Sequence, residues 1–279
     1  MKCPFCNAEI ADRAASCPNC GTTFSDTETR RVPNASVGIK TAKTAGNAGI
    51  LLGNAARKAR MVAAVDPDEI VSDRVYNGTI IAVLFWGLLV NYLMCRYIRT
   101  ESLVSLVENP LVFFIGYFVL AFGGIILAAK SHNPILSFLG YNMVVVPFGV
   151  VISIAVSAYG GLESQVVTYA FLYTMLITIG MMACFLIAPD FFSKIGGMLS
   201  AVLIGLVLCE LILLLIGVKQ NVIDWVAAGL FSLYIGYDIY RSQQFPKTID
   251  NAVDSALDIY LDIANLFIRI LSILGKRKD

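Results

Sequence analysis

Four cysteines near the start of the chain have the spacing of a tetrahedral metal site. Cys3 and Cys6 form one C-x-x-C pair, and Cys17 and Cys20 form a second pair ten residues further along. Each C-x-x-C turn aims two sulfur atoms at one point, so two such turns supply the four thiolates of a Zn²⁺ site. Because protein ligands then fill every position, the sequence predicts a structural zinc site with no open catalytic position.

Two alternatives use the same four thiols: a pair of disulfides in an exported domain, or iron in the same S₄ geometry. No charged segment followed by an apolar run and a small-residue cleavage site precedes Cys3, so we expect a metal. The CPFC and CPNCG knuckles resemble the zinc-ribbon family, which implies zinc coordination and a structural or partner-binding role. The remaining cysteines lie in apolar runs and are expected to be small buried residues: Cys95, Cys184 and Cys209.

Carboxylates inside apolar runs are the second group of residues with chemical potential. Ionisable side chains at membrane depth are costly, and they mark functional sites by default. Asp238 lies in LYIGYDIYRSQ, and Glu210 is an isolated acid in LVLCELILLLIG that would line the same cavity or lie near its end. A further stripe has spacings of four, four, three and four residues, which predicts one helix face: Asp254, Asp258, Asp262, Asn265 and Arg269.

A helix with that stripe must face other helices or a wet cavity if it spans a membrane. Two alternatives remain at this point. The helix would lie flat at the membrane interface, or the acids would only pair with Arg269.

Composition shows what must position these residues. The chain has 279 residues, of which 57% are hydrophobic and 15% are charged. Soluble domains average about 45–50% apolar and ~25% charged residues, so the mean hydropathy of +0.74 indicates a membrane protein. A net charge of +1 argues against nucleic-acid binding through bulk positive charge. The expected domains are a zinc ribbon (1–24), a basic tether (25–71) and a membrane domain (72–279).

The tether has a weak helical stripe of small apolar residues with basic side chains around it. A basic amphipathic helix rests on an anionic lipid leaflet, whereas the four glycines at 38, 46, 49 and 53 favour a flexible linker. The basic tether predicts a cytoplasmic N-terminus in a prokaryotic plasma membrane, in agreement with reduced thiolates in the ribbon. The run Asp66-Pro67-Asp68-Glu69 is typical of a helix start.

Seven apolar stretches have about the 20 residues that cross a bilayer core. The sequence therefore predicts an all-α membrane protein, a bundle of seven transmembrane helices. With the N-terminus in the cytoplasm, four basic residues fall on cytoplasmic loops: Lys130, Lys194, Arg241 and Lys247. The side of the C-terminus stays open. The expected spans are 79–98, 110–129, 134–157, 166–188, 195–217, 222–241 and 255–274.

Two segments near the end of the chain resemble the closing signature of a known family. SALDIYLDIANLFIRIL, preceded by YIGYDIYRSQ, is similar to that of the Bax inhibitor-1 family of seven-helix, pH-responsive calcium-leak proteins. AFLYTMLITIGMMACFLIAPDFFSKIGGML resembles the family's fourth and fifth spans, and SDRVYNGTIIAVLF the beginning of its first. The resemblance covers roughly residues 72–274 and leaves the ribbon and tether outside. It implies that the C-terminal helix is central, with the other six around it.

The resemblance also implies residue roles. The family's two pH-sensing aspartates fall on Asp238 and Asp262, and Asp258 would widen the acidic surface. Two carboxylates in a dry site cannot both ionise cheaply, so they would share a proton and titrate as a unit. Loss of that proton would create a site of oxygen ligands, which suits Ca²⁺. The family motif often reads YDTQ, so the Ile239-Tyr240 pair here lacks a polar neighbour.

The sequence leaves two functions open. One is a pH-sensitive cation leak, with Ca²⁺ or H⁺ as its ions, controlled by Asp238 and Asp262. The other is a non-conducting membrane anchor or stress-response scaffold that recruits a cytosolic protein through its ribbon. We do not expect an enzyme, because the single histidine, His132, lies in a loop and no phosphate-cradling loop is evident. A pathway needs both aspartates ionisable, whereas an anchor would tolerate asparagine at both positions.

Overall fold

The computed structural model describes residues 67–98, 110–131, 133–217 and 221–276. The predicted ribbon with Cys3, Cys6, Cys17 and Cys20, and nearly all of the tether, lie outside these residues. The described chain is helical throughout and has no strands, which confirms the all-α prediction. It comprises a 3₁₀ turn, η2 (Pro67–Glu69), and the helices α2 (Asp73–Tyr97), α4 (Pro110–Lys130), α5 (Pro134–Ala158), α6 (Gln165–Ile187), α7 (Pro189–Leu215), α8 (Asn221–Ser242) and α9 (Ile249–Gly275).

The helix boundaries follow from capping residues. The side chains of Ser72, Asn133 and Thr248 accept hydrogen bonds from backbone N–H groups in the first turns of α2, α5 and α9. The helix start expected at Asp66-Pro67 forms only η2, and α2 begins after the Ser72 cap. Helices α7 and α9 each begin six residues before the predicted span, at Pro189 and after Thr248. Lys194 therefore lies within α7 and not in a loop.

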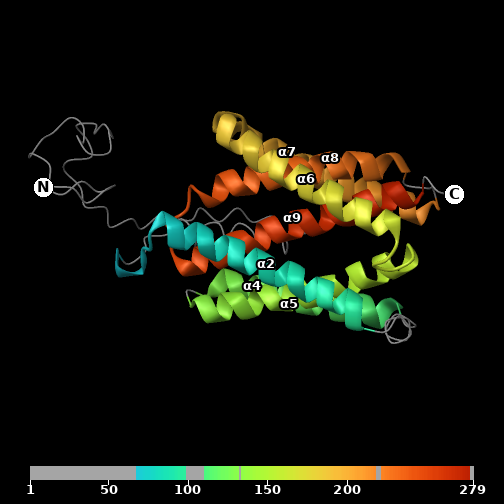
Figure 1. Ribbon diagram of the computed structural model, residues 1–279, viewed down its shortest axis with the longest axis horizontal. Coiled ribbons are helices and arrows are strands. Elements are labelled where there is room, and N and C mark those ends of the chain that lie inside the picture. The colour runs from blue at the N-terminus through green and yellow to red at the C-terminus, as the bar shows by residue number, and fades with distance from the viewer. Residues whose placement is uncertain (1–66, 99–109, 132, 218–220, 277–279) are drawn as a thin grey trace, which may run out of the picture. The chain divides into compact units, whose positions relative to one another are not determined.

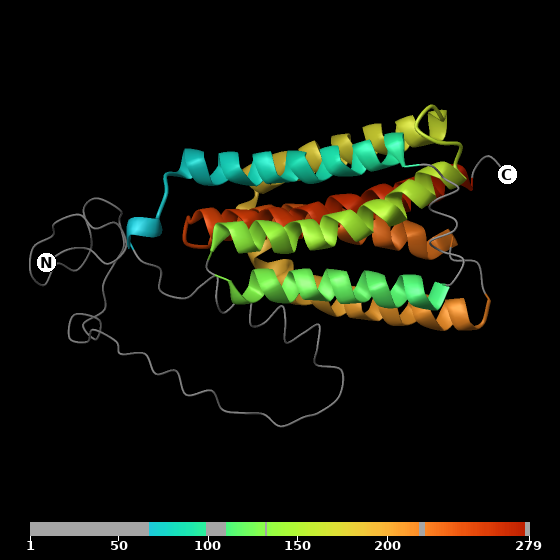
Figure 2. The same ribbon diagram turned by 90° about the horizontal axis from the view of Figure 1, so that it is seen from below.

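Helix α9 lies at the centre of the bundle. It packs against α2, α5, α6 and α8, while α4 packs on α5 and α7 packs on α8. Figures 1 and 2 show α9, in red, between the group of α2, α4 and α5 and the group of α6, α7 and α8. The expected central helix is confirmed, although α4 and α7 lie further out in the bundle. Its central position excludes the alternative of a helix lying flat at the membrane interface.

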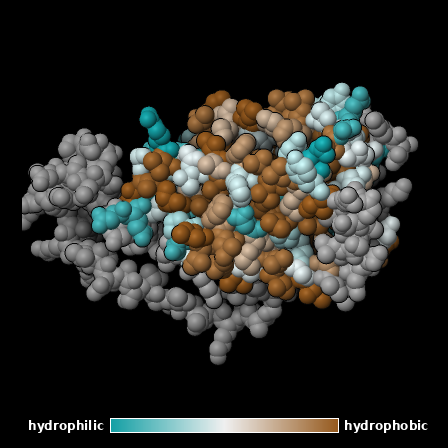
Figure 3. Space-filling view, turned by 60° about the horizontal axis from the view of Figure 1, so that its bottom comes forward, coloured by the Kyte–Doolittle hydropathy of each residue, from teal (hydrophilic) through white to brown (hydrophobic). Residues whose placement is uncertain are grey.

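The outer surface of the bundle is apolar and its interior carries charge. Figure 3 shows hydrophobic side chains over much of one face. Large side chains such as Ile187 and Leu215 are 83% and 78% exposed, whereas Asp224, Asp238 and Asp262 are buried. This inversion of the usual pattern is what lipid as a solvent demands. Cys184 and Cys209, which we expected to be buried, lie on the exposed surface, because an apolar thiol is as stable against lipid as in a core.

Five of the described helices are long and apolar enough to cross a membrane: α2, α5, α6, α7 up to Leu213, and α8 from Val222. Within α4, the apolar helical stretch Ile115–Ala128 is shorter than these five spans. Helix α9 is not among these five apolar helices, because it has too many charged residues. They fall at four-residue intervals from Asp250 to Asp262 and again at Arg269. The count of seven transmembrane spans therefore stays a prediction, although helices occupy all seven predicted stretches.

Candidate functional site

Four carboxylates lie along the N-terminal half of α9. Asp250, Asp254 and Asp262 are buried, and the Asp258 side chain is 17% exposed. A step of four residues turns a helix by about 400°, so each carboxylate lies ~40° further around the axis than the one before it. The four carboxylates therefore cover an arc of about 120° around α9, which is one face of the helix as predicted. Asp250 accepts a hydrogen bond from Ser137 of α5, whereas Asp258 and Asp262 interact with α8.

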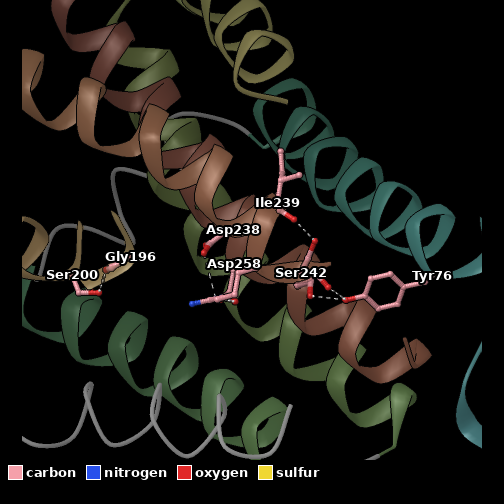
Figure 4. Close-up of polar contacts among 9 residues, drawn as sticks. Tyr76, Gly196, Ser200, Asp238, Ile239, Ser242 and Asp258 are labelled. Atoms are coloured by element: carbon pink, nitrogen blue, oxygen red, sulfur yellow. Dashed lines mark hydrogen bonds and ion pairs between the residues drawn. The ribbon is translucent and has the colours of Figure 1, made fainter. Parts of the chain in front are cut away.

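The last two carboxylates meet α8 around a single guanidinium group. Arg241 forms a close ion pair with Asp258, and its Nη2 atom lies 3.5 Å from Oδ1 of Asp238. The guanidinium also lies 5.7 Å from the ring centroid of Tyr237 and 5.9 Å from that of Phe245, distances typical of cation–π contacts. Figure 4 shows Asp238 and Asp258 next to each other between the two helices.

Asp262 completes the cluster one turn further along α9. Its carboxyl group is hydrogen-bonded to Asp238 and lies within the electrostatic reach of Asp258 and Arg241. Its Oδ2 atom is buried and has no hydrogen-bond donor among the described residues. We call Asp238, Asp258, Asp262 and Arg241 the acidic site. Among the described residues, Arg241 is the cation that these three carboxyl groups face, so carboxyl groups outnumber cations in this part of the structure.

A second charged cluster joins α7, α8 and the C-terminal part of α9. The guanidinium group of Arg269 lies 2.6 Å from Oε1 of Glu210 and 3.0 Å from Oδ1 of Asp224. The other oxygen of Asp224 lies 2.7 Å from Nζ of Lys276 and accepts a hydrogen bond of 2.8 Å from Ser272. We call Glu210, Asp224, Arg269 and Lys276 the balanced network, because it has two carboxylates and two cations.

The sequence-predicted residues thus divide between two places. Asp238, Asp258 and Asp262 come together, as their assignment to one site requires. Glu210, for which a place in the same cavity or near its end was expected, and Arg269, expected on the same helix face, instead belong to the balanced network. The alternative in which the α9 acids only pair with Arg269 is wrong, because Glu210 and Asp224 occupy that guanidinium group.

Four charged residues with buried contacts were not among the predicted site residues: Arg241 of the acidic site, Asp224 and Lys276 of the balanced network, and Asp250 of α9. Arg241 counted only as a loop charge, although its position three residues after Asp238 was a signal for a pair on one helix face. Asp250 lay outside the predicted span, although it continues the four-residue spacing upstream of Asp254. No sequence signal joined Asp224 to Lys276, since their contact depends on how α8 packs against α9.

Neither cluster forms a ready-made metal cage. In the part of the chain that the structure describes, no group of three or more His, Cys, Asp or Glu side chains is arranged to hold a metal ion. A cation at the acidic site would therefore meet carboxylates that one guanidinium group already engages. Among the described residues, the acidic site has more carboxyl groups than cations. These carboxyl groups are shielded from water and come from two helices, α8 and α9.

Comparison with known proteins identifies the family of the chain. Residues 70–279 match the family described as Inhibitor of apoptosis-promoting Bax1. The chain belongs to this family, the Bax inhibitor-1 family. The match begins just before α2 and includes every described helix from α2 to α9, so both charged clusters lie within the family domain. The family and the apolar helices together identify it as an integral membrane protein.

Two curated relatives come from Helicobacter pylori, strains 26695 and J99, and both are described as uncharacterized proteins. Each is 43% identical to this chain over 90 residues, which is 31% of this chain and 38% of the relative. The chain therefore matches little more than a third of the length of these relatives. These two relatives therefore show similarity over one 90-residue segment, and we base no activity of the whole protein on them.

Proposed function

We propose that this Bax inhibitor-1 family protein is a pH-sensitive leak pathway for cations, Ca²⁺ in particular, controlled by Asp238 and Asp262. The observation that carries the proposal is the charge imbalance of the acidic site. Two carboxyl groups on different helices contact each other, and the cation beside them is already paired with Asp258. A buried imbalance of this kind favours uptake of a proton or of a cation from outside.

The protonated pair corresponds to a closed pathway. A hydrogen bond between two carboxyl groups needs a proton on one of them, so a proton shared by Asp238 and Asp262 joins α8 to α9. In this state Arg241 neutralises Asp258, and one negative charge remains, which Asp238 and Asp262 share with their common proton. The contact between α8 and α9 is then stable without any bound ion.

Loss of the shared proton opens the pathway. Two adjacent carboxylates in a site of low dielectric constant repel each other, which weakens the contact between α8 and α9. The same carboxylates offer the hard oxygen ligands that Ca²⁺ prefers. Because the described residues form no complete cage, Ca²⁺ would pass through the site and would not remain bound there. Arg241 competes with an entering cation for the carboxylate of Asp258, because it is already paired with that group.

Flux of Ca²⁺ into proteoliposomes, measured as a function of external pH, tests the proposal. We expect wild-type flux to rise as the pH is raised, and Asp238→Asn and Asp262→Asn to hold flux low and nearly independent of pH. Asp190→Asn is the matched control, because Asp190 is exposed in the first turn of α7 and lies outside the acidic site. Equal background flux in all four proteins would refute the proposal and leave a membrane anchor as the better explanation.

We also propose that Cys3, Cys6, Cys17 and Cys20 bind one structural Zn²⁺ and that this ribbon recruits a cytosolic protein. The spacing of the two C-x-x-C pairs supports this assignment. Metal analysis of the purified full-length protein should give one zinc per chain, and replacement of Cys17 and Cys20 by serine should abolish it. Iron in place of zinc, or a protein with two disulfides and no metal, would contradict it.

A further inference from the structure

Hydrogen bonds and an ion pair join the beginning of α2 to the end of α8 and the connection between α8 and α9. The backbone N–H of Val71 donates to the carbonyl oxygen of Lys247 at 2.8 Å, and Nζ of Lys247 lies 2.6 Å from Oδ1 of Asp73. One turn further along, Nε2 of Gln243 donates to Oδ1 of Asn77 at 2.9 Å. These contacts hold the start of α2 against the residues that immediately follow Arg241 in the chain.

Tyr76 forms the buried centre of this attachment. Its side chain is fully buried, and its hydroxyl group donates to the carbonyl oxygen of Ser242 at 2.8 Å and lies 3.2 Å from Oγ of Ser255. Figure 4 shows Tyr76 reaching Ser242 from the side opposite Asp238 and Asp258. One hydroxyl group therefore contacts both helices of the acidic site.

The two partners of this hydroxyl group lie next to the charged residues. Ser242 is the last residue of α8 and directly follows Arg241, and Ser255 lies one turn before Asp258 on α9. The last carbonyl groups of a helix have no partner within that helix, so an outside donor decides how they are held. At Ser242 the donor is Tyr76, which makes α2 part of the structure that sets the end of α8 against α9.

We propose that Tyr76 is a positioning residue for the acidic site. Its hydroxyl group fixes the end of α8 relative to α9 and thereby maintains the pairing of Arg241 with Asp258, which leaves Asp238 and Asp262 to exchange the proton. The inference rests on the proposed function, and it extends control of the pathway to a helix that contributes no charge to the site. Loss of the hydroxyl group should change the pH at which the pathway opens.

The surroundings of the site show why the hydroxyl group acts through position. The described titratable and charged groups that face the site are Tyr234, Tyr237, Asp238 and Arg241 from α8, Asp254, Asp258 and Asp262 from α9, and Tyr76 from α2. Helix α6, which also packs on α8 and α9, has no charged residue. A phenol is neutral at physiological pH, so Tyr76 influences the carboxylates through its hydrogen bonds.

The test compares Tyr76→Phe with a matched tyrosine in the same proteoliposome assay. Tyr141 is also fully buried, and its hydroxyl group donates to the carbonyl oxygen of Val83 at 2.9 Å, so Tyr141→Phe removes a similar hydrogen bond elsewhere in the bundle. We expect the midpoint of the flux–pH curve to move by ~0.5–1 pH unit in Tyr76→Phe, which corresponds to one net hydrogen bond, and not in Tyr141→Phe.

A second variant keeps the test decisive if Tyr76→Phe folds poorly. Ser255→Ala removes the α9 partner and leaves the tyrosine ring in place, and we expect it to move the midpoint in the same direction. Equal midpoints in wild type, Ser255→Ala and Tyr141→Phe would overturn the inference while wild-type flux still depended on Asp238 and Asp262. If wild-type flux did not depend on these aspartates, the proposed function would fail, and the role of Tyr76 would be refuted with it.

Discussion

The acidic site and the balanced network both join α8 to α9, and the network also includes Glu210 of α7. Both are largely shielded from water. They differ in charge. The acidic site has three carboxyl groups for Arg241, whereas in the balanced network Arg269 and Lys276 match two carboxylates. Within the network, both oxygens of Asp224 have close partners. The buried Oδ2 of Asp262 has no donor among the described residues.

This difference explains why one cluster suits structure and the other suits function. Taking charges out of water is costly, and a buried group is stable when each charge has a partner with good geometry. The balanced network meets that condition and ties α7, α8 and α9 together. The acidic site meets it only with a proton or an external cation present, so its stability depends on the solution. Charge balance, and not burial, separates the two clusters.

Removal of Arg269 should have the largest effect on stability. Arg269→Met removes the cation that contacts both Glu210 and Asp224, and we expect the free energy of unfolding to fall by about 3 kcal/mol. Denaturation of the detergent-solubilised protein measures this change. Lys194→Met is the control, since Lys194 is exposed on α7. If both variants lost the same stability, the network would not be the structural element that its charge balance indicates.

Removal of Arg241 should have a smaller effect that depends on pH. Arg241→Gln removes the described cation that contacts Asp238 and Asp258, which costs about 2 kcal/mol near neutral pH. Protons from solution can replace the missing charge, so the loss should shrink as the pH is lowered. Melting temperatures of this variant and of Arg269→Met, measured from pH 5 to pH 8, provide the comparison. A loss that stayed constant over this range would contradict a titrating acidic site.

Replacement of an aspartate by asparagine should change the stability in opposite directions in the two clusters. Asp262→Asn removes one excess negative charge and should raise stability at pH 8 by about 1 kcal/mol, because it relieves repulsion from Asp238. Asp224→Asn removes a carboxylate that binds Arg269 and Lys276, so it should lower stability. The melting temperatures of the two variants, measured side by side at pH 8, decide the matter. Destabilisation by both substitutions would show that the acidic site is also a structural network.

The smallest effect is expected at the ion pair outside both clusters. The Asp73 side chain is 78% exposed, so its pair with Lys247 is screened by water and should contribute less than about 0.5 kcal/mol. Asp73→Asn should therefore leave the melting temperature nearly unchanged in low and in high salt. A large loss would mean that the attachment of α2 depends on this ion pair more than on the buried hydroxyl group of Tyr76.

Much of the architecture followed from local sequence. The predicted span 134–157 agrees with α5, which the Asn133 cap begins, and Gly160 and Gly161, both with positive φ, lie in the gap between this span and the next one. The spacing of acids in the last apolar stretch indicated a helix that could not face lipid. The short signature around Asp238 and Asp262 was sufficient to indicate the Bax inhibitor-1 family, because its residues are close together in the chain.

The rest depended on packing between distant segments. The apolar pattern set the start of the last span at residue 255, whereas the Thr248 cap starts α9 earlier and brings Asp250 into the helix. The partners of Arg269 lie 45 and 59 residues away in the chain, at Asp224 and Glu210, and no periodicity connects them. The role of Arg241 was hidden for the same reason, because its contact with Asp258 exists only once α8 and α9 lie side by side.

The buried charges of α9 also constrain how the protein is made. A helix with carboxylates along half its length and Arg269 in the other half is poorly soluble in lipid on its own. It becomes stable only beside α2, α5, α6 and α8, all of which precede it in the chain. We therefore expect α9 to insert last among the described helices, after α2, α5, α6 and α8 have assembled. The acidic site consequently does not exist until this last described helix is in place.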